Sequence, residues 1–162
     1  SQSNINLTVT STITIGTWAK LETAAGASNQ TLFQQLNGSG SGKQWLYRSS
    51  ISDKLCGVIA SGAICHPTSA SFPTGQWFHL ALIAKSSTNP NTTAQVLYQN
   101  GAVVESNNSG AAITSNIAQF YLGRYLAPST SFEEWQGKID EVRIYNRVLT
   151  AEEIQAIYNS EK

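Results

Sequence analysis

The sequence predicts an all-β domain, a sandwich or a barrel, with one short helix at its C-terminal end. Short runs rich in β-branched and aromatic residues recur along the chain, with turn residues between them, as in sandwiches and barrels. Asn100-Gly101 separates two such runs and accepts the positive φ angles of a type I′ hairpin turn. The 162 residues suit one domain, residues 1–162, that can bury a core.

The strands are expected where apolar residues cluster or alternate between turn residues. They cover Thr12–Leu21, Thr31–Leu36, Gln44–Ile51, Lys54–Ile59, Gln76–Lys85, Ala94–Gln99, Ala102–Glu105, Phe120–Gly123 and Lys138–Tyr145. Flexible loops are expected at 37–43 and 86–93, where small and polar residues gather.

The helix is expected over Thr150–Asn159 and has a complete start signal. Thr150 suits the N-cap, and Glu153, three residues on, can reach back to the N–H of the cap residue. Leu149 and Ile154 form the matching hydrophobic staple. One helical face is apolar and carries Ile154, Ile157 and Tyr158.

The composition excludes some partners. Charged residues make up 12%, and ten Lys and Arg balance ten Asp and Glu. Because there is no basic patch, we expect no nucleic-acid partner, and no apolar stretch is long enough for membrane insertion. The abundance of Ser, Thr, Asn and Gly is typical of surfaces outside the cell, so an extracellular or cell-surface location is expected. Because the sequence has no signal peptide and no Met, it is expected to be a mature domain or a piece excised from a longer protein.

Two cysteines, Cys56 and Cys65, flank a possible hairpin. If Ala60 and Ser61 form its tip, the cysteines lie directly opposite one another, within reach of a disulfide. Two reduced core thiols are the alternative. Zinc binding is disfavoured, since only His66 lies nearby and the spacing matches no zinc pattern. A disulfide indicates an oxidising compartment.

Five segments in order resemble a known family. They read STITIGTWAKLE, TGQWFHLALIAK, LYQNGAVVES, FYLGRY and GKIDEVRIYNRVLTAEEI. Together they are similar to laminin-G-like jelly-roll domains of the concanavalin A-like lectin/glucanase group. The resemblance implies two antiparallel sheets packed as a jelly-roll sandwich. It also implies one more N-terminal strand, which Asn4–Val9 can supply.

Asp140 is the most informative polar residue. Strict alternation along its strand places Asp140 on one face with Val142 and Ile144, where a carboxylate is costly unless it is paired or coordinated. The resemblance implies a structural Ca²⁺ at Asp140, held together with backbone carbonyls of the N-terminal region. No acidic residue precedes Glu22, so such a set would bind weakly. In the alternative interpretation, Asp140 accepts hydrogen bonds from backbone N–H groups.

Catalysis is not expected. Hydrolases of the concanavalin A-like group carry closely spaced carboxylates on one strand as nucleophile and acid. This chain has two Asp, Asp53 and Asp140, neither in such a run, and Glu133 and Glu134 are consecutive, so they would point to opposite sides of a strand. No nucleophile elbow, metalloprotease motif or P-loop is found.

The aromatic residues divide between packing and binding. Trp18 and Trp77 match core positions of the family strands, and Trp135 and His79 are also assigned to the core. The predicted ligand-binding set combines flat rings with hydrogen-bonding companions near two loops. It consists of Trp45, Tyr47, Tyr125, Arg48, Arg124 and Asn37. The alternative is that Trp45 and Tyr47 pack inside the sandwich.

We therefore expect a non-catalytic carbohydrate-binding or adhesive module that binds a glycan or cell-surface ligand. It would be a monomeric module within a larger extracellular protein. A structural or protein-binding domain with no sugar site is the alternative. An exposed, coplanar pair of aromatic rings would favour the first function, and a polar face with all aromatics buried would favour the second.

Overall fold

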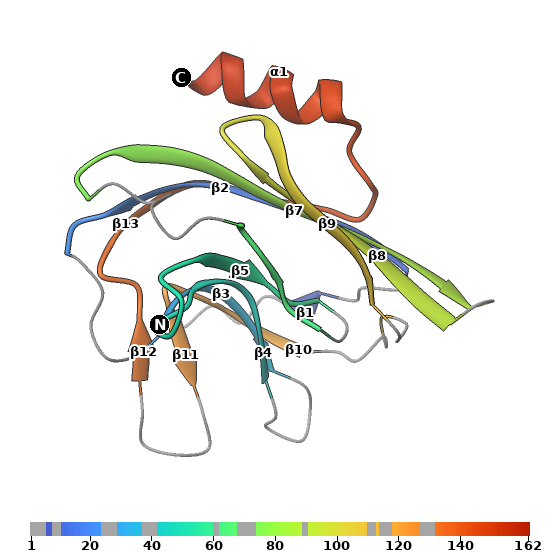
Figure 1. Cartoon of the computed structure of the whole chain (residues 1–162), viewed down its shortest axis with the longest axis horizontal. Helices are drawn as coiled ribbons and strands as arrows, with labels where there is room; N and C mark the ends of the chain where they lie inside the picture. Colours follow the sequence, from blue (N-terminus) through green and yellow to red (C-terminus); the bar gives the residue numbers. More distant parts are fainter. Residues whose placement is uncertain are drawn as a thin grey trace.

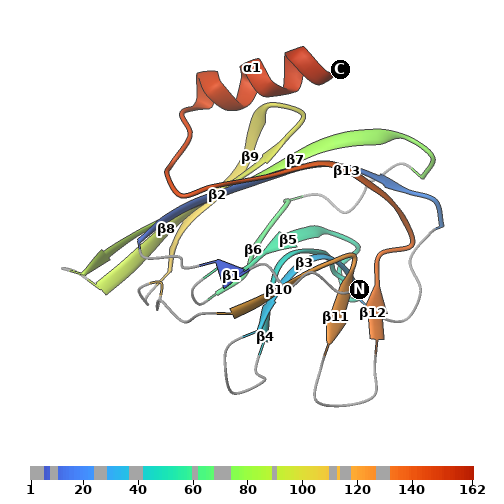
Figure 2. The ribbon, with the colours of Figure 1, turned by 180° about the vertical axis from the view of Figure 1, so that it is seen from behind.

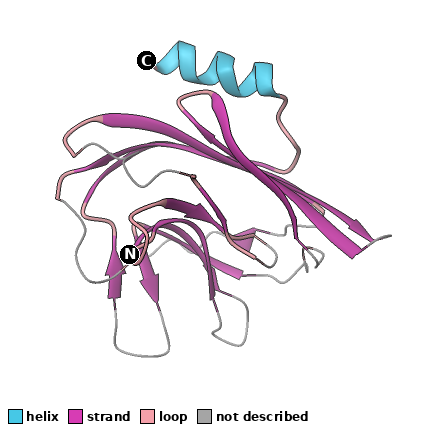
Figure 3. Cartoon of the chain, viewed as in Figure 1, coloured by secondary structure: helices cyan, strands magenta, loops and turns pink. Residues whose placement is uncertain are grey.

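The protein folds as two facing sheets with a helix outside one of them (Figure 1). The computed structural model describes residues 6–7, 11–23, 29–36, 42–59, 62–67, 74–88, 91–109, 113, 118–126 and 132–162. Strands dominate these residues, and they contain one helix, at the C-terminal end (Figure 3). The predicted sandwich with a C-terminal helix is confirmed.

The first sheet has five antiparallel strands in the order β13-β2-β7-β8-β9. Their bounds are β2 Thr12–Leu21, β7 Trp77–Thr88, β8 Asn91–Gln99, β9 Ala102–Ser109 and β13 Gly137–Tyr145. The β8–β9 turn is the predicted hairpin, since Asn100 and Gly101 both have positive φ, 52° and 79°. The loop expected at 86–93 is mostly strand instead, because β7 and β8 stay paired out to Thr88 and Asn91.

The second sheet has eight strands in the order β1-β10-β3-β4-β5-β6, with β11 and β12 beside β3. Their bounds are β1 Asn6–Leu7, β3 Gln30–Leu36, β4 Gly42–Arg48, β5 Leu55–Gly57, β6 Ile64–Cys65, β10 Ala118–Leu122, β11 Arg124–Leu126 and β12 Phe132–Glu134. The pairs are antiparallel apart from one parallel bridge between β12 and β3. The view from behind shows this sheet facing the five-stranded one (Figure 2). The expected N-terminal strand is found as β1.

The main core fills the space between the sheets. Fully buried aliphatic and aromatic side chains come from both, for example Ile15 and Leu80 from one sheet and Phe33 and Leu46 from the other. Trp135 is 7% exposed and packs in this core, as predicted. Burial of such side chains, at about 1.5–3 kcal/mol each, is the main stabilising contribution.

Cys56 and Cys65 lie opposite one another on β5 and β6 and form a disulfide. The predicted pairing is therefore confirmed. The tip residues Ala60 and Ser61 lie outside the described residues.

Helix α1, Ala151–Glu161, covers the outer face of the five-stranded sheet. Both halves of the predicted capping box form, with Thr150 and Glu153 each accepting from the other's N–H, at 3.2 and 2.8 Å. Leu149 and Ile154 are buried against Ala81 and Tyr98, so the helix starts over the middle of the sheet. The outer face of this sheet is thereby a second, smaller core, which ends where the helix ends.

Candidate functional site

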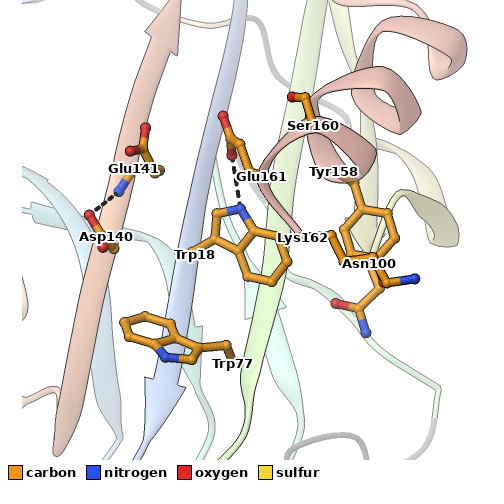
Figure 4. Close-up of a pocket in the computed structure, with 9 residues that line it drawn as sticks. All are labelled: Trp18, Trp77, Asn100, Asp140, Glu141, Tyr158, Ser160, Glu161 and Lys162. Carbon is orange, nitrogen blue, oxygen red and sulfur yellow. Dashed lines mark hydrogen bonds between the residues drawn. The ribbon is translucent and has the colours of Figure 1, made fainter.

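A pocket of about 710 Å³ lies where the C-terminal end of α1 meets the outer face of the five-stranded sheet (Figure 4). We call it the helix-end pocket. It is lined by side chains from β2, β7, β13, the β8–β9 turn and the last turn of the helix. The lining residues are Trp18, Trp77, Asn100, Asp140, Glu141, Tyr158, Ser160, Glu161 and Lys162.

Aromatic rings form one wall of the helix-end pocket. Trp18 stacks on Tyr158 of the helix, with ring centroids 5.7 Å apart and planes 23° from parallel. His79 lies behind them, 5.6 Å from the Trp18 ring and 2% exposed. Burial of the imidazole, and secondarily the positive charge of Arg143, lower the pKa of His79 to about 4. This ring is therefore neutral at pH 7 and serves packing.

Trp77 is the solvent-exposed member of the aromatic wall. It is 43% exposed, although the sequence assigned it to the core, and that prediction is wrong. Along β7, Ile83 and Ala81 lie under the first turns of the helix and His79 lies beside Tyr158, while Trp77 comes next, where the helix has ended. Its indole extends from β7 over β2 into the helix-end pocket (Figure 4).

Polar groups fix the position of the Trp18 ring. Its Nε1 donates a hydrogen bond of 2.8 Å to Glu161 Oε2, and the other Glu161 oxygen pairs with Arg143 of β13. Arg143 also donates to Glu141, at 3.1 Å. The last helical turn is thereby tied to β2 and β13, and the stacked rings are held in a defined geometry.

Asp140 lies on the outer face, at the side of the helix-end pocket opposite the helix. A β-bulge shifts the register between Asp140 and Arg143, and Glu141 has a positive φ of 48°. Because of the extra residue, Ile139 and Val142 both face the main core, whereas Asp140 is exposed. The prediction that Asp140 shares a face with Val142 and Ile144 is therefore wrong. Its Oδ1 accepts the N–H of Glu141 at 2.8 Å.

A calcium ion at Asp140 would need oxygen ligands other than the described carboxylates. Ca²⁺ takes six to eight oxygen ligands, and the neighbouring carboxylate of Glu141 is held by Arg143. Among the residues that the structure describes, no group of three His, Cys, Asp or Glu is placed to hold a metal ion. Calcium at Asp140 stays a prediction.

The described members of the predicted ligand-binding set lie on the other sheet. Tyr47 of β4 is half-buried and stands opposite Thr31 and Cys56. Its neighbour Arg48 is buried, at 3% exposed, and forms an ion pair with Asp53 in the following turn. Arg48 is therefore engaged in the structure of this turn.

Arg124 and Tyr125 belong to β11, and Trp45 to β4. These two strands lie on either side of β3, so the fold places them on one sheet, as the prediction needs. Arg124 is half-buried, while the side chains of Trp45 and Tyr125, and the whole of Asn37, lie outside the described residues. Their role in binding stays a prediction.

The sequence contained one signal for the helix-end pocket. Both faces of β7 are apolar, Phe78, Leu80 and Leu82 on one side, Trp77 and Ala81 on the other. A strand that is apolar on both faces must be covered twice, and the only predicted element free to cover the second face is the C-terminal helix. Sequence reasoning missed this because it assigned Trp77, together with Trp18, Trp135 and His79, to the core.

Comparison with solved structures shows the same fold at low identity. Domain 4 of AbnA, an extracellular GH43 arabinanase from Geobacillus stearothermophilus in complex with arabinotriose, is 24% identical, with a TM-score of 0.61, over 97% of this chain and 73% of that one. The CBM40 of Ruminococcus gnavus IT-sialidase, bound to α2,6-sialyllactose, is 16% identical, with a TM-score of 0.59, over 91% and 83% of the two chains. These likenesses establish the fold alone.

The chain also matches part of a larger enzyme. Trypanosoma rangeli sialidase in complex with sialic acid is 16% identical, with a TM-score of 0.67, over 93% of this chain. The match spans only 23% of the sialidase chain. No curated protein sequence matches significantly.

The sequence profile of a family covers almost the whole chain. It matches residues 1–155 and is that of Laminin_G_3, described as Concanavalin A-like lectin/glucanases superfamily. Within the described part of the chain, no helix has the length and apolar character needed to cross a membrane. The two-sheet sandwich, the order of its motifs and this match agree, and the chain belongs to the Laminin_G_3 family of the concanavalin A-like lectin/glucanase superfamily.

Proposed function

We propose that this domain is a non-catalytic carbohydrate-binding module and that the helix-end pocket is its sugar site. The observation that carries the proposal is the exposed indole of Trp77 beside the stacked rings of Trp18 and Tyr158. Partly exposed rings in a fixed geometry are the feature expected of a sugar-binding surface rather than of a purely structural domain.

The helix-end pocket has the size and chemistry that a sugar needs. Its volume of about 710 Å³ lies within the usual range for small-ligand sites. The flat face of Trp77 can pack against the apolar face of a pyranose or furanose ring. Asp140 supplies acceptors for hydroxyl groups of the sugar, and the Asn100 amide nitrogen supplies a donor, since its oxygen accepts from the backbone N–H of His79. The Ser160 hydroxyl, which donates to the Ile157 carbonyl, can accept one more hydrogen bond.

The described carboxylates of the helix-end pocket favour binding over hydrolysis. Most glycosidases use two carboxyl groups across the scissile bond, one free to give a proton and one free to attack or activate water. Glu141 and Glu161 are both engaged by Arg143, and Glu161 also accepts from Trp18. Of the three carboxylates that line the pocket, Asp140 alone forms no ion pair with a described residue.

The proposal includes the setting of the module. A disulfide between Cys56 and Cys65 suits an extracellular or cell-surface protein, because such bonds persist in oxidising compartments. We infer a monomeric module carried by a larger protein. Shallow recognition of this kind gives affinities of about −4 to −8 kcal/mol, that is, millimolar to micromolar.

The test compares the two sheets directly. A glycan array identifies a bound sugar, and titration calorimetry then measures its affinity for wild type, Trp77→Ala and Tyr47→Ala. We expect Trp77→Ala to weaken binding at least tenfold, about 1.4 kcal/mol, and Trp77→Phe to retain part of the affinity. Tyr47→Ala should leave binding unchanged.

The reverse pattern, with loss in Tyr47→Ala only, would move the sugar site to the eight-stranded sheet. Absence of binding to every glycan, with and without Ca²⁺, would leave the structural or protein-binding function. Running the array with Ca²⁺ and with chelator also tests the predicted metal, since a calcium-dependent module would lose affinity or melting temperature in chelator.

A further inference from the structure

The helix-end pocket carries more negative than positive charge. Its lining includes the carboxylates of Asp140, Glu141 and Glu161 and one cation, Lys162. Arg143 contacts two of these carboxylates from outside the lining. Three carboxylates against two cations leave a net charge of −1.

The position of that charge follows from the ion pairs. Glu141 and Glu161 share the Arg143 guanidinium, so their charges are largely compensated. Asp140 forms no ion pair with a described residue and accepts only the neutral N–H of Glu141. The uncompensated charge is therefore on Asp140.

Asp140 lies on the same side of Trp18 as the Trp77 indole, the ring proposed to pack against the sugar, and Lys162 lies on the other side. Asp140 stands directly opposite Trp18 on β2, on the side where the Trp77 indole extends (Figure 4). Lys162 lies on the other side of Trp18, with its Nζ 5.5 Å from the centre of the Tyr158 ring. Two lysines share this outer face, Lys20 opposite Trp77 and Lys138 opposite Lys20, but neither lines the helix-end pocket, and Lys138 pairs with Glu22 at 3.6 Å.

We propose that the helix-end pocket selects uncharged sugars with adjacent hydroxyl groups and rejects carboxylated sugars such as sialic and uronic acids. This inference rests on the proposed function of the same pocket. A carboxylate accepts hydrogen bonds and donates none, so the two oxygens of Asp140 suit two neighbouring hydroxyls. A sugar carboxylate placed there meets a like charge instead.

The proposed selectivity separates this chain from its structural neighbours of sialidase origin. The CBM40 with the same fold is bound to α2,6-sialyllactose. If the ligand class followed the fold, this chain would bind that glycan too. If it follows the charge of the pocket, as we propose, it does not.

The experiment compares the binding of uncharged oligosaccharides with that of acidic ones and of the uncharged methyl esters of those acids. Binding of arabinotriose, lactose and xylotriose is compared with that of α2,6-sialyllactose and trigalacturonic acid by calorimetry at low salt. The methyl esters of the two acids keep the sugar skeleton and remove the charge. We expect at least one uncharged sugar to bind and the acids to bind at least tenfold more weakly, with the esters recovering most of the difference. High salt should narrow the gap, because it screens exposed charges.

Asp140→Asn tests the residue itself. It removes the charge and one hydroxyl acceptor, so we expect weaker binding of the uncharged sugar, by about fivefold to tenfold, and a smaller gap between acid and ester. Glu152→Gln is the matched control, since this exposed carboxylate stands in the first turn of the helix, outside the lining of the pocket, and should change neither value.

The outcomes separate a failure of the proposed function from a failure of the proposed selectivity. If no sugar binds in a manner sensitive to Trp77→Ala, the proposed function fails and the selectivity fails with it. If sugars bind but wild type takes the acids as tightly as their esters, or Asp140→Asn leaves the gap unchanged, the selectivity is overturned while the carbohydrate-binding function stands.

Discussion

The two outer faces of the sandwich are covered in different ways. On the five-stranded sheet, α1 buries Ala81, Ile83 and Tyr98 and then ends, which leaves Trp77 partly exposed beside it. On the eight-stranded sheet, Tyr47 stands opposite Thr31 on the side away from the core residue Leu46, and no described helix covers it.

The difference shows that a pocket forms where a covering element ends. Under the helix, apolar side chains are fully buried and can only stabilise. Where the helix stops, the same row of outward-facing residues becomes one wall of a pocket, and the last helical turn becomes another. A ring at this border keeps a rigid setting and still reaches solvent, which is the combination that sugar binding needs.

The largest expected effect tests whether helix α1 packs on the outer face of the five-stranded sheet and stabilises the fold. Ile154 is 1% exposed under the helix, so Ile154→Ala should lower the free energy of unfolding by about 2–5 kcal/mol, measured by urea denaturation. Gln155→Ala, one residue along on the exposed side, should cost under about 0.5 kcal/mol. Equal losses in the two variants would show that the helix does not pack as described.

A second test addresses the other sheet, where the Cys56–Cys65 disulfide joins the terminal strand β6 to its neighbour β5. Reduction should lower the free energy of unfolding by about 2–3 kcal/mol, because it releases a short closed loop in the unfolded chain. The effect of the reductant on the urea midpoint should vanish in a Cys56→Ser/Cys65→Ser variant. Sugar affinity at the helix-end pocket should stay constant under reduction, since the disulfide is in the opposite sheet, and a parallel loss would couple the two faces.

The smallest expected effect concerns pH. The pKa of His79 is about 4 in the folded protein and about 6.5 when unfolded, so the unfolded chain binds the proton more tightly between these values. The free energy of unfolding should therefore fall as the pH drops through this range, by about 2 kcal/mol between pH 7 and pH 5. Denaturation at several pH values checks this, and His79→Gln should remove that part of the pH dependence. An unchanged pH profile in His79→Gln would mean that the imidazole is not buried beside Trp18 and Tyr158.

Local patterns predicted most of the fold. Thr12–Leu21 is β2 at both ends, the Asn100-Gly101 turn is where its φ preference put it, and the Thr150 capping box forms as expected. Each of these features depends on residues within a few positions of one another, so the local sequence specifies it whatever packs against it. The cysteine pair was predictable for the same reason, because a hairpin fixes which residues stand opposite.

The placement of side chains at the site was decided only in three dimensions. Strict alternation predicted that Asp140 shares an apolar face with Val142 and Ile144. The β-bulge at Glu141 breaks this alternation and leaves Asp140 exposed on the outer face. Trp77 was predicted to lie in the core because it is apolar. It is partly exposed because helix α1, which begins some seventy residues later in the chain, ends before it covers Trp77. The sequence by itself determined most of the longer strands, the Asn100-Gly101 turn and the helix, since these follow from short-range preferences. Which outward-facing residues are covered depends on where distant elements start and stop over the sheet, and this only the packed structure decides.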